Sequence, residues 1–130
     1  MKLLDTNVII RFLLKDHPTQ SPASKTLFEN STEDLILSDV GLAEIIWLLT
    51  SFYKFSKQEV IEKIYNLLKV NNLVVNRTLI IRTLYFYGNF SINYIDAYLA
   101  AYSEQEKLER IYSFNKDLDK IKPVKRFEPK

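Results

Sequence analysis

The 130-residue sequence contains no cysteine, one histidine and only two glycines. Without cysteine there can be no disulfide, thiolate nucleophile or Cys-ligated zinc. A single histidine, His17, excludes a multi-histidine metal site, and because it precedes Pro18 in a polar turn we expect it to face solvent. Gly41 and Gly88 lie far apart, so neither glycine-rich phosphate loop, GxGxxG or GxxxxGK[ST], is present.

A large net charge and long apolar runs are missing as well. The net charge of +2 is too small to argue nucleic-acid binding from charge alone. No apolar run is long enough to cross a bilayer, and the N-terminus lacks the features of a signal peptide, so we expect a cytoplasmic protein. A length of 130 residues with 47% hydrophobic content predicts a single domain, residues 1–130, with one core.

Short apolar segments alternate with longer helical patterns along the chain. A capping box at Ser56 and Glu59 predicts one helix start, Ser38 or Asp39 caps another helix, and Gly88 is expected to end a third. The expected strands are residues 2–4, 35–37, 73–75, 111–114 and 124–127, and the expected helices are residues 6–14, 18–28, 40–53, 56–70, 76–87 and 93–110. This alternation predicts the α/β class, with a mostly parallel sheet covered by helices on both faces.

Polar residues follow several of these strands. Asp5 interrupts an apolar stretch directly after the first strand, Ser38 and Asp39 follow the second, and Asn115 follows the fourth. Ligands in such sheets bind outside the carboxyl ends of the strands. Asp5 has two interpretations, as the N-cap of the helix that begins at Thr6 or as part of a site at this edge.

Two more acids lie on expected helices. Glu44 has only apolar or small residues three and four positions away, which favours a partly buried carboxylate facing a cleft; the alternative is an exposed Glu on a thin polar edge. Asp96 falls in the first turn of a helix that Asn93 would cap, which suits both the helix dipole and a site near the top of the sheet.

The last candidates, Asn115, Asp117 and Asp119, lie in "SFNKDLDKI", flanked by lysines, where loop acids usually face solvent. Acids gathered at one edge would raise each other's pKa unless a cation neutralised them. With no cysteine and one histidine, the available ligands are hard oxygens, which select Mg²⁺ or Mn²⁺.

Three motifs in register over nearly the whole chain resemble those of PIN-domain ribonucleases, most of all the VapC toxins of type II toxin–antitoxin systems. "LLDTNVIIRFLL" is similar to the opening motif and gives Asp5, Thr6 and Asn7. "LSDVGLAEIIWLL" resembles the second motif, with Glu44, and "INYIDAYLAAYS" the third, with Asp96. The fourth motif departs from the family pattern.

At that fourth position the family often has an acid directly after the last strand, and this chain has Asn115. Asp117 is the nearest acid that could substitute for it. The resemblance therefore implies that Asp5, Glu44 and Asp96 are catalytic, with Asp117 as the substitute for the fourth acid. Thr6, Asn7 and Asn115 would be in substrate-binding or supporting positions.

The resemblance also implies a PIN-like three-layer α/β/α sandwich with a roughly five-stranded sheet, and a Mg²⁺-dependent endoribonuclease acting on RNA. Asp5 and Asp96 would bind the metal, Glu44 would orient or deprotonate water, and Asn7 would hydrogen-bond a neighbouring carboxylate. A small antitoxin protein is the implied partner, and homodimers are common. Residues expected to guide RNA are the basic side chains near the site strands, Arg11, Lys15, Lys116 and Lys120; "YFYGNFSINY" could form a dimer or antitoxin surface.

Two other functions compete with this interpretation. A phosphoaspartyl domain would use Asp5 as phosphoacceptor, but Asn7 stands where haloacid-type phosphatases need a second acid. A non-catalytic RNA- or protein-binding module on the same fold is favoured if Asn115 has broken the metal site.

Overall fold

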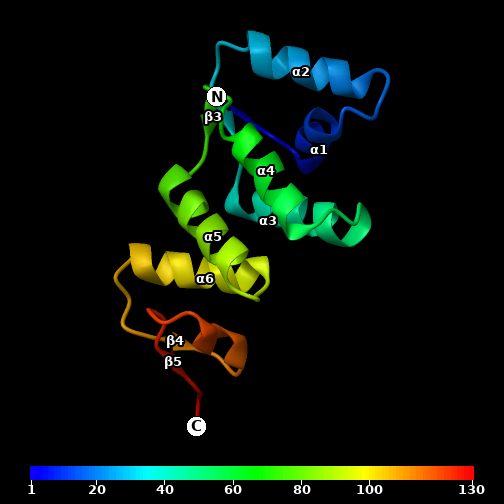
Figure 1. Cartoon of the computed structure of the whole chain (residues 1–130). Coiled ribbons are helices and arrows are strands. Elements are labelled where there is room, and N and C mark those ends of the chain that lie inside the picture. The colour runs from blue at the N-terminus through cyan, green and yellow to red at the C-terminus, as the bar shows by residue number, and fades with distance from the viewer. The chain divides into compact units, whose positions relative to one another are not determined.

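The computed structural model describes all residues from 1 to 130 and divides the chain into two compact units. Unit 1 is Met1–Val75 and unit 2 is Asn76–Lys130. Each unit contains its own parallel strands and helices, and each is described by itself below (Figure 1).

Unit 1 is built on a three-stranded parallel sheet. Its strands are β1 (Lys2–Leu3), β2 (Leu35–Ile36) and β3 (Leu73–Val74), in the order β1-β2-β3. The ladder extends one residue further, because the Leu4 amide donates to the Ile36 carbonyl at 2.8 Å. The three strands lie where the sequence predicted them, each one residue shorter. The first strand lies mostly at the surface: Leu3 is 73% exposed, and only Leu4 enters the core.

The helices of unit 1 follow the sequence closely. They are α1 (Thr6–Leu14), α2 (Gln20–Asn30), α3 (Asp39–Trp47), a π-helical turn η1 (Leu48–Phe52) and α4 (Lys57–Leu67). The residues of this unit that are completely buried are all aliphatic: Ile9, Ile45, Leu49, Val60, Ile64 and Leu67. They recur at helical spacing, which is why these segments form helices and bury one face.

Side-chain caps set where these helices begin. Ser38 caps α3 by accepting a hydrogen bond from the Gly41 amide at 3.0 Å, so Ser38 and not Asp39 is the N-cap. The predicted capping box of α4 is present, with Ser56 and Glu59 exchanging hydrogen bonds between side chain and backbone. Both caps satisfy amide groups that a helix start leaves without intrahelical partners.

The start of α2 corrects two expectations. The helix begins at Gln20, two residues later than predicted, and His17 provides its cap: Nδ1 of the half-buried His17 ring accepts from the amides of Thr19 and Gln20, at 3.3 and 3.0 Å. The prediction that His17 simply faces solvent was wrong, because its ring replaces the missing side-chain cap of Thr19.

Unit 2 packs two helices and a pair of parallel strands. Its elements are α5 (Arg77–Asn89), α6 (Tyr94–Gln105), β4 (Ile111–Tyr112), the 3₁₀ helix η2 (Lys116–Lys120) and β5 (Arg126–Phe127). In Figure 1, β4 and β5 run beside each other, close to η2 and α6. The buried Leu118 and Ile121 anchor η2, and the helices bury residues such as Leu84, Phe86 and Ala97.

Gly88 does not end α5. The helix continues through it to Asn89, and Gly88 has no positive φ that would mark a left-handed helix end. The aromatic segment around it is largely core: Phe86, Tyr87 and Tyr94 are buried, and Tyr85 is exposed.

The α/β class with parallel strands, predicted from the alternation of elements, is confirmed. Five short strands are present, three in unit 1 and two in unit 2, and every strand pairing is parallel. The single domain over residues 1–130 stays a prediction. None of the helices combines the length and the apolar character that a membrane span requires.

Candidate functional site

The four acids expected to be catalytic are divided equally between the two units. Asp5 and Glu44 belong to unit 1, and Asp96 and Asp117 belong to unit 2. Within neither unit do three or more carboxylates or histidines gather closely enough to hold a metal ion. The convergence of residues 5, 44 and 96 at one edge of a sheet therefore stays a prediction.

Asp5 follows β1 and is the N-cap of α1. Its Oδ1 accepts a hydrogen bond from the Thr6 amide at 2.8 Å, and its Oδ2 accepts one from Asn7 Nδ2 at 3.4 Å. The structure therefore contains both the predicted N-cap and the expected hydrogen bond from Asn7 to a neighbouring carboxylate. Asp5 is exposed, so its carboxylate is accessible to a ligand while these two donors restrict its rotation.

Glu44 lies in the middle of α3 and is exposed. Its side chain makes no hydrogen bond and no ion pair. The expectation of a partly buried carboxylate was wrong, because the apolar neighbours that suggested burial are themselves at the surface: Val40 is 81% exposed and Trp47 is 61% exposed. Glu44 keeps its rotamer freedom and can turn toward an incoming group.

Asp96 is the most enclosed of the candidate acids, at 6% exposed. It lies in the first turn of α6, where the Asn93 side chain accepts from the Asp96 amide at 2.8 Å. The positive end of a helix dipole favours a carboxylate there. Asn115 Nδ2 donates to Asp96 Oδ2 at 2.9 Å, so Asp96 is held by a residue 19 positions away.

The other carboxylate oxygen, Asp96 Oδ1, accepts no hydrogen bond. No side-chain nitrogen or oxygen in the structure is both fully enclosed and without a partner, so this oxygen retains contact with the surface. A carboxylate with one oxygen fixed and the other available is the arrangement that a metal ligand supported by a neighbouring amide would have.

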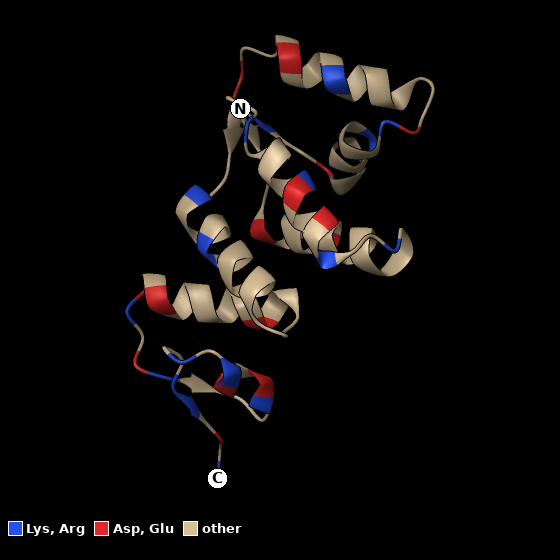
Figure 2. Ribbon diagram, viewed as in Figure 1, with Lys and Arg blue, Asp and Glu red and all other residues tan.

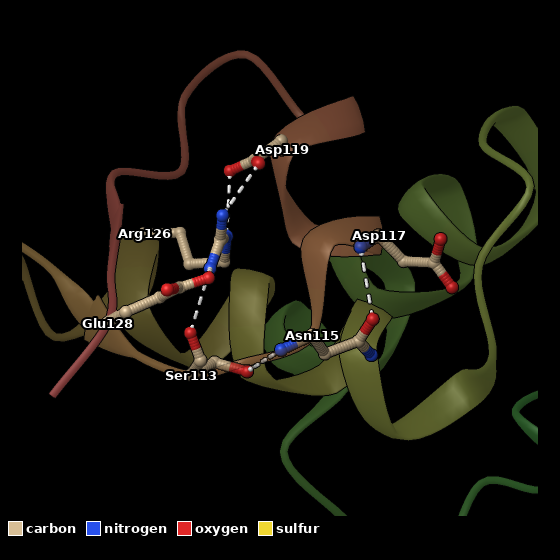
Figure 3. A network of polar contacts seen from close by, with 6 residues as sticks. All are labelled: Ser113, Asn115, Asp117, Asp119, Arg126 and Glu128. Carbon is tan, nitrogen blue, oxygen red and sulfur yellow. Dashed lines mark hydrogen bonds and ion pairs between the residues drawn. The ribbon is translucent and has the colours of Figure 1, made fainter.

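The side chain of Asn115 forms two hydrogen bonds, one to the start of η2 and one to Asp96. Its Oδ1 accepts from the backbone amide of Asp117 at 3.0 Å and so caps η2 (Figure 3). Its Nδ2 donates to Asp96. Asp117 itself forms an ion pair with Lys120 at 3.0 Å. Asn115 and Asp96 are therefore brought together, and the carboxylate of Asp117 is engaged by a lysine.

The basic residues expected to guide RNA differ in how free they are. Arg11 pairs with Asp16 at 2.8 Å and donates to the Tyr53 hydroxyl at 3.1 Å, which ties α1 to the segment after η1. Lys120 is also engaged, whereas Lys15 and Lys116 are exposed and make no ion pair. Figure 2 shows acidic and basic segments interspersed along the C-terminal part of unit 2, so that region presents no block of one sign.

Two functional candidates were missed by the sequence analysis. Ser113 and Arg126 join the contacts around Asn115: the Asn115 amide donates to Ser113 Oγ, and Arg126 donates to the Ser113 carbonyl, each at 2.9 Å. No local pattern indicates these contacts. The Arg126 guanidinium also grips Asp119 and lowers the pKa of that carboxyl.

A cavity of about 1190 Å³ in unit 1 lies beside α1 and α2. Its lining includes Ser31, Asn71 and Asn72, which precede β2 and β3, so it opens at the amino ends of these strands. Asp5 follows the carboxyl end of β1, at the opposite edge of the same parallel sheet. None of the predicted catalytic or metal-binding residues lines this cavity, whereas Lys15, one of the basic residues expected to guide RNA, does.

A family model described as the PIN domain matches residues 2–123, a range that includes all the candidate acids. The chain belongs to the PIN domain family. PIN domains are generally metal-dependent nucleases, and PIN nucleases bind RNA. A search of curated proteins finds no match for the chain.

Each unit of this PIN domain supplies a carboxylate whose chemistry suits a hard divalent cation. Asp5 is accessible and Asp96 has one oxygen without a partner, and both supply carboxylate oxygen, the ligand type that Mg²⁺ and Mn²⁺ prefer. No cysteine is present, and Nδ1 of the single histidine is used in a helix cap, which leaves soft or multi-nitrogen sites without ligands.

Proposed function

We propose that this PIN domain is a Mg²⁺-dependent endoribonuclease that hydrolyses RNA phosphodiester bonds. The observation that carries the proposal is the state of Asp96: a nearly buried carboxylate at a helix start, with one oxygen held by Asn115 and the other without a partner. Burial of a carboxylate costs free energy, and a bound cation offsets that cost.

In this proposal Asp5 and Asp96 hold the cation, with Mn²⁺ as a substitute for Mg²⁺. A divalent cation held there would lower the pKa of a bound water and would neutralise charge that develops on the phosphate. Asn7 restrains Asp5, and Asn115 restrains Asp96, so that each carboxylate presents one orientation. The side chain of Glu44, which has no other partner, turns toward the attacking water and accepts its proton. The water oxygen bonds to phosphorus as the phosphorus–oxygen bond to the leaving nucleotide breaks, and the leaving oxygen takes a proton from solvent water.

Lys15 and Lys116 are the basic residues best able to contact the RNA backbone, because neither forms an ion pair within the chain. Arg11 and Lys120 already contact neighbouring groups and serve the protein's own structure first. Phosphate contacts of this kind position the nucleic acid without reading its sequence.

We further propose that the protein is the VapC-like toxin of a toxin–antitoxin pair, a cytoplasmic protein that forms homodimers and is inhibited by a small antitoxin. The support is the agreement of the three motifs around Asp5, Glu44 and Asp96 in order, spacing and flanking apolar residues. An antitoxin that inserts a basic side chain among these carboxylates would take the place of the cation. A short neighbouring reading frame that encodes a DNA-binding protein would support this role.

Cleavage of a mixed RNA pool tests the nuclease. We expect endonucleolytic products with Mg²⁺ or Mn²⁺, none with a chelator, and at least about a hundredfold slower cleavage for Asp5→Asn and Glu44→Gln. The matched control is Glu62→Gln, which alters an exposed glutamate on α4 of the same unit and leaves cleavage unchanged. Metal-independent cleavage, or equal activity of Glu44→Gln and Glu62→Gln, would contradict the proposal.

A non-catalytic RNA- or protein-binding module is the second candidate. The observation that favours it is Asn115, an amide at the position where the family often has an acid, which donates to Asp96 and not to a ligand. Metal titration separates the two functions. A nuclease gains stability from Mn²⁺ by binding linkage and its melting temperature rises, whereas the binding module shows an unchanged melting curve at millimolar Mn²⁺ and no RNA cleavage.

A further inference from the structure

The guanidinium of Arg126, near the C-terminus, is tightly held although the segment around it is exposed. Its side chain is 11% exposed. Nε and Nη2 donate to the two carboxylate oxygens of Asp119 at 2.9 and 3.0 Å, and Nη1 donates to the Ser113 carbonyl and to Glu128, both at 2.9 Å (Figure 3). The bidentate pairing with Asp119 fixes the plane of the guanidinium.

These contacts lead from Arg126 to Asp96 through two residues. The Ser113 carbonyl accepts from Arg126, and Ser113 Oγ accepts from the Asn115 amide, both at 2.9 Å. The Asn115 side chain then donates to Asp96 Oδ2, also at 2.9 Å. We call this chain of contacts, Arg126–Ser113–Asn115–Asp96, the positioning relay.

The orientation of the Asn115 side-chain amide is determined by its two partners. Its oxygen faces the backbone N–H of Asp117, which can only donate, and its nitrogen faces the carboxylate of Asp96, which can only accept. A flipped amide would place donor against donor and acceptor against acceptor. The position of the Asn115 backbone therefore decides where Asp96 Oδ2 is held.

The 3₁₀ helix that follows Asn115 is anchored from two sides. Asp119 is gripped by Arg126 of β5, and Lys120 donates to the Ser91 carbonyl at 2.9 Å, in the segment before α6. Leu118, which directly precedes these two residues, is completely buried. Loss of Arg126 leaves the Lys120 anchor and the buried Leu118 in place, so η2 remains but its Ser113 side loosens.

We propose that Arg126 is a positioning residue, which acts through Ser113 and Asn115 to hold Asp96 with its unpartnered oxygen ready for a divalent cation. This inference rests on the proposed function, in which Asp96 binds the metal. Arg126 lies beyond residues 2–123, the range that the family model matches, so the relay adds to what that match covers.

A measurement in the metal-free protein tests the relay without depending on catalysis. The side-chain amide protons of Asn115 are expected to exchange slowly with solvent in the wild type and about tenfold faster or more in Arg126→Met. Arg82→Met is the matched control: Arg82 makes a similar bidentate pair with Glu104, at 2.7 and 3.0 Å, between α5 and α6 of the same unit. The Arg82→Met variant loses a comparable ion pair, and its Asn115 side-chain amide protons should still exchange slowly with solvent.

Mn²⁺ affinity measured by calorimetry tests the consequence for Asp96. We expect Arg126→Met to raise the Mn²⁺ dissociation constant about tenfold or more, Arg126→Lys to raise it less, and Arg82→Met to leave it unchanged. Combining Arg126→Met with Asn115→Ala should add little to Asn115→Ala alone, because both act on one relay. Melting curves show whether each variant is folded. If Arg126→Met does not fold, the same measurements are made on Arg126→Lys.

The outcomes separate failure of the inference from failure of the proposed function. If the wild type binds Mn²⁺ and Arg126→Met binds it equally well, or if the two substitutions are fully additive, the positioning role is overturned. If the side-chain amide protons of Asn115 exchange with solvent as slowly in Arg126→Met as in the wild type, the relay is overturned, and this holds whether or not the protein binds Mn²⁺. If the wild type binds no Mn²⁺, the proposed function fails and the cation role of the relay fails with it, whereas the amide measurement still shows whether Arg126 holds Asn115.

Discussion

Asp96 in unit 2 and Glu44 in unit 1 are both acids on helices with apolar neighbours, yet they are held in different ways. Asp96 is 6% exposed, its amide is capped by Asn93, and Asn115 holds one of its oxygens. Glu44 is exposed and its side chain contacts no partner. A buried carboxylate must have its hydrogen bonds supplied by the fold, whereas an exposed one has them supplied by water.

This contrast matches the two roles that the proposed function assigns. A metal ligand gains from being fixed before the cation arrives, because little rotamer entropy is then lost on binding. A proton acceptor that meets a moving water can remain free to rotate. Asp5 stands between the two, since it is exposed but restrained by the Thr6 amide and, at 3.4 Å, by Asn7.

The largest expected change in stability comes from Leu118, a buried residue of unit 2, the unit that contains Asp96. Leu118→Ala should lower the free energy of unfolding by about 2–5 kcal/mol, because Leu118 is completely buried in η2 and its removal leaves a cavity. Urea unfolding measures the loss. Leu108→Ala, at a leucine that is 53% exposed, is the control and should change stability by no more than about 0.5 kcal/mol. Similar values for the two variants would mean that η2 is not anchored by its buried leucine.

The comparison itself is tested by truncating both acids in the metal-free protein. Asp96→Ala should destabilise the fold by about 1–3 kcal/mol, because it leaves the Asn115 amide without its acceptor and removes an acid from the first turn of α6. Glu44→Ala should change stability by less than about 0.5 kcal/mol, since no contact is lost and alanine favours a helix. Equal effects in thermal and urea unfolding would show that the two acids are held alike.

The smallest effect is expected at Asp119, whose side chain is more than half exposed in its pairing with Arg126. The hydrogen bonds from Arg126 lower the pKa of Asp119 from its ordinary value of 3.8, so the pair stabilises the fold above that pH and the stabilisation is lost as pH falls through the lowered pKa. Asp119→Asn should therefore lower the melting temperature slightly at pH 7, and the difference from wild type should shrink below about pH 4. A difference that grows on acidification would contradict this assignment.

The sequence predicts the structure correctly where the signals are local. The bounds of α1, the capping box at Ser56 and the cap at Asn93 were all predicted, because a capping side chain acts on amides two or three residues away. It failed at Gly88, through which α5 continues to Asn89, and at His17, whose ring caps a helix in place of Thr19. It also failed for the burial of Glu44, because apolar neighbours on a helix do not reveal whether that face is covered.

By itself, the sequence determined the helices, the parallel α/β class and the order of the candidate acids, since periodicity and caps act over one or two helical turns. Only the tertiary structure decided which of these acids is held by another residue. The contact from Asn115 to Asp96 spans 19 residues and that from Arg126 to Ser113 spans 13. Hydrogen bonds over such separations depend on how helices and strands pack, and packing leaves no periodic trace in the residues that take part.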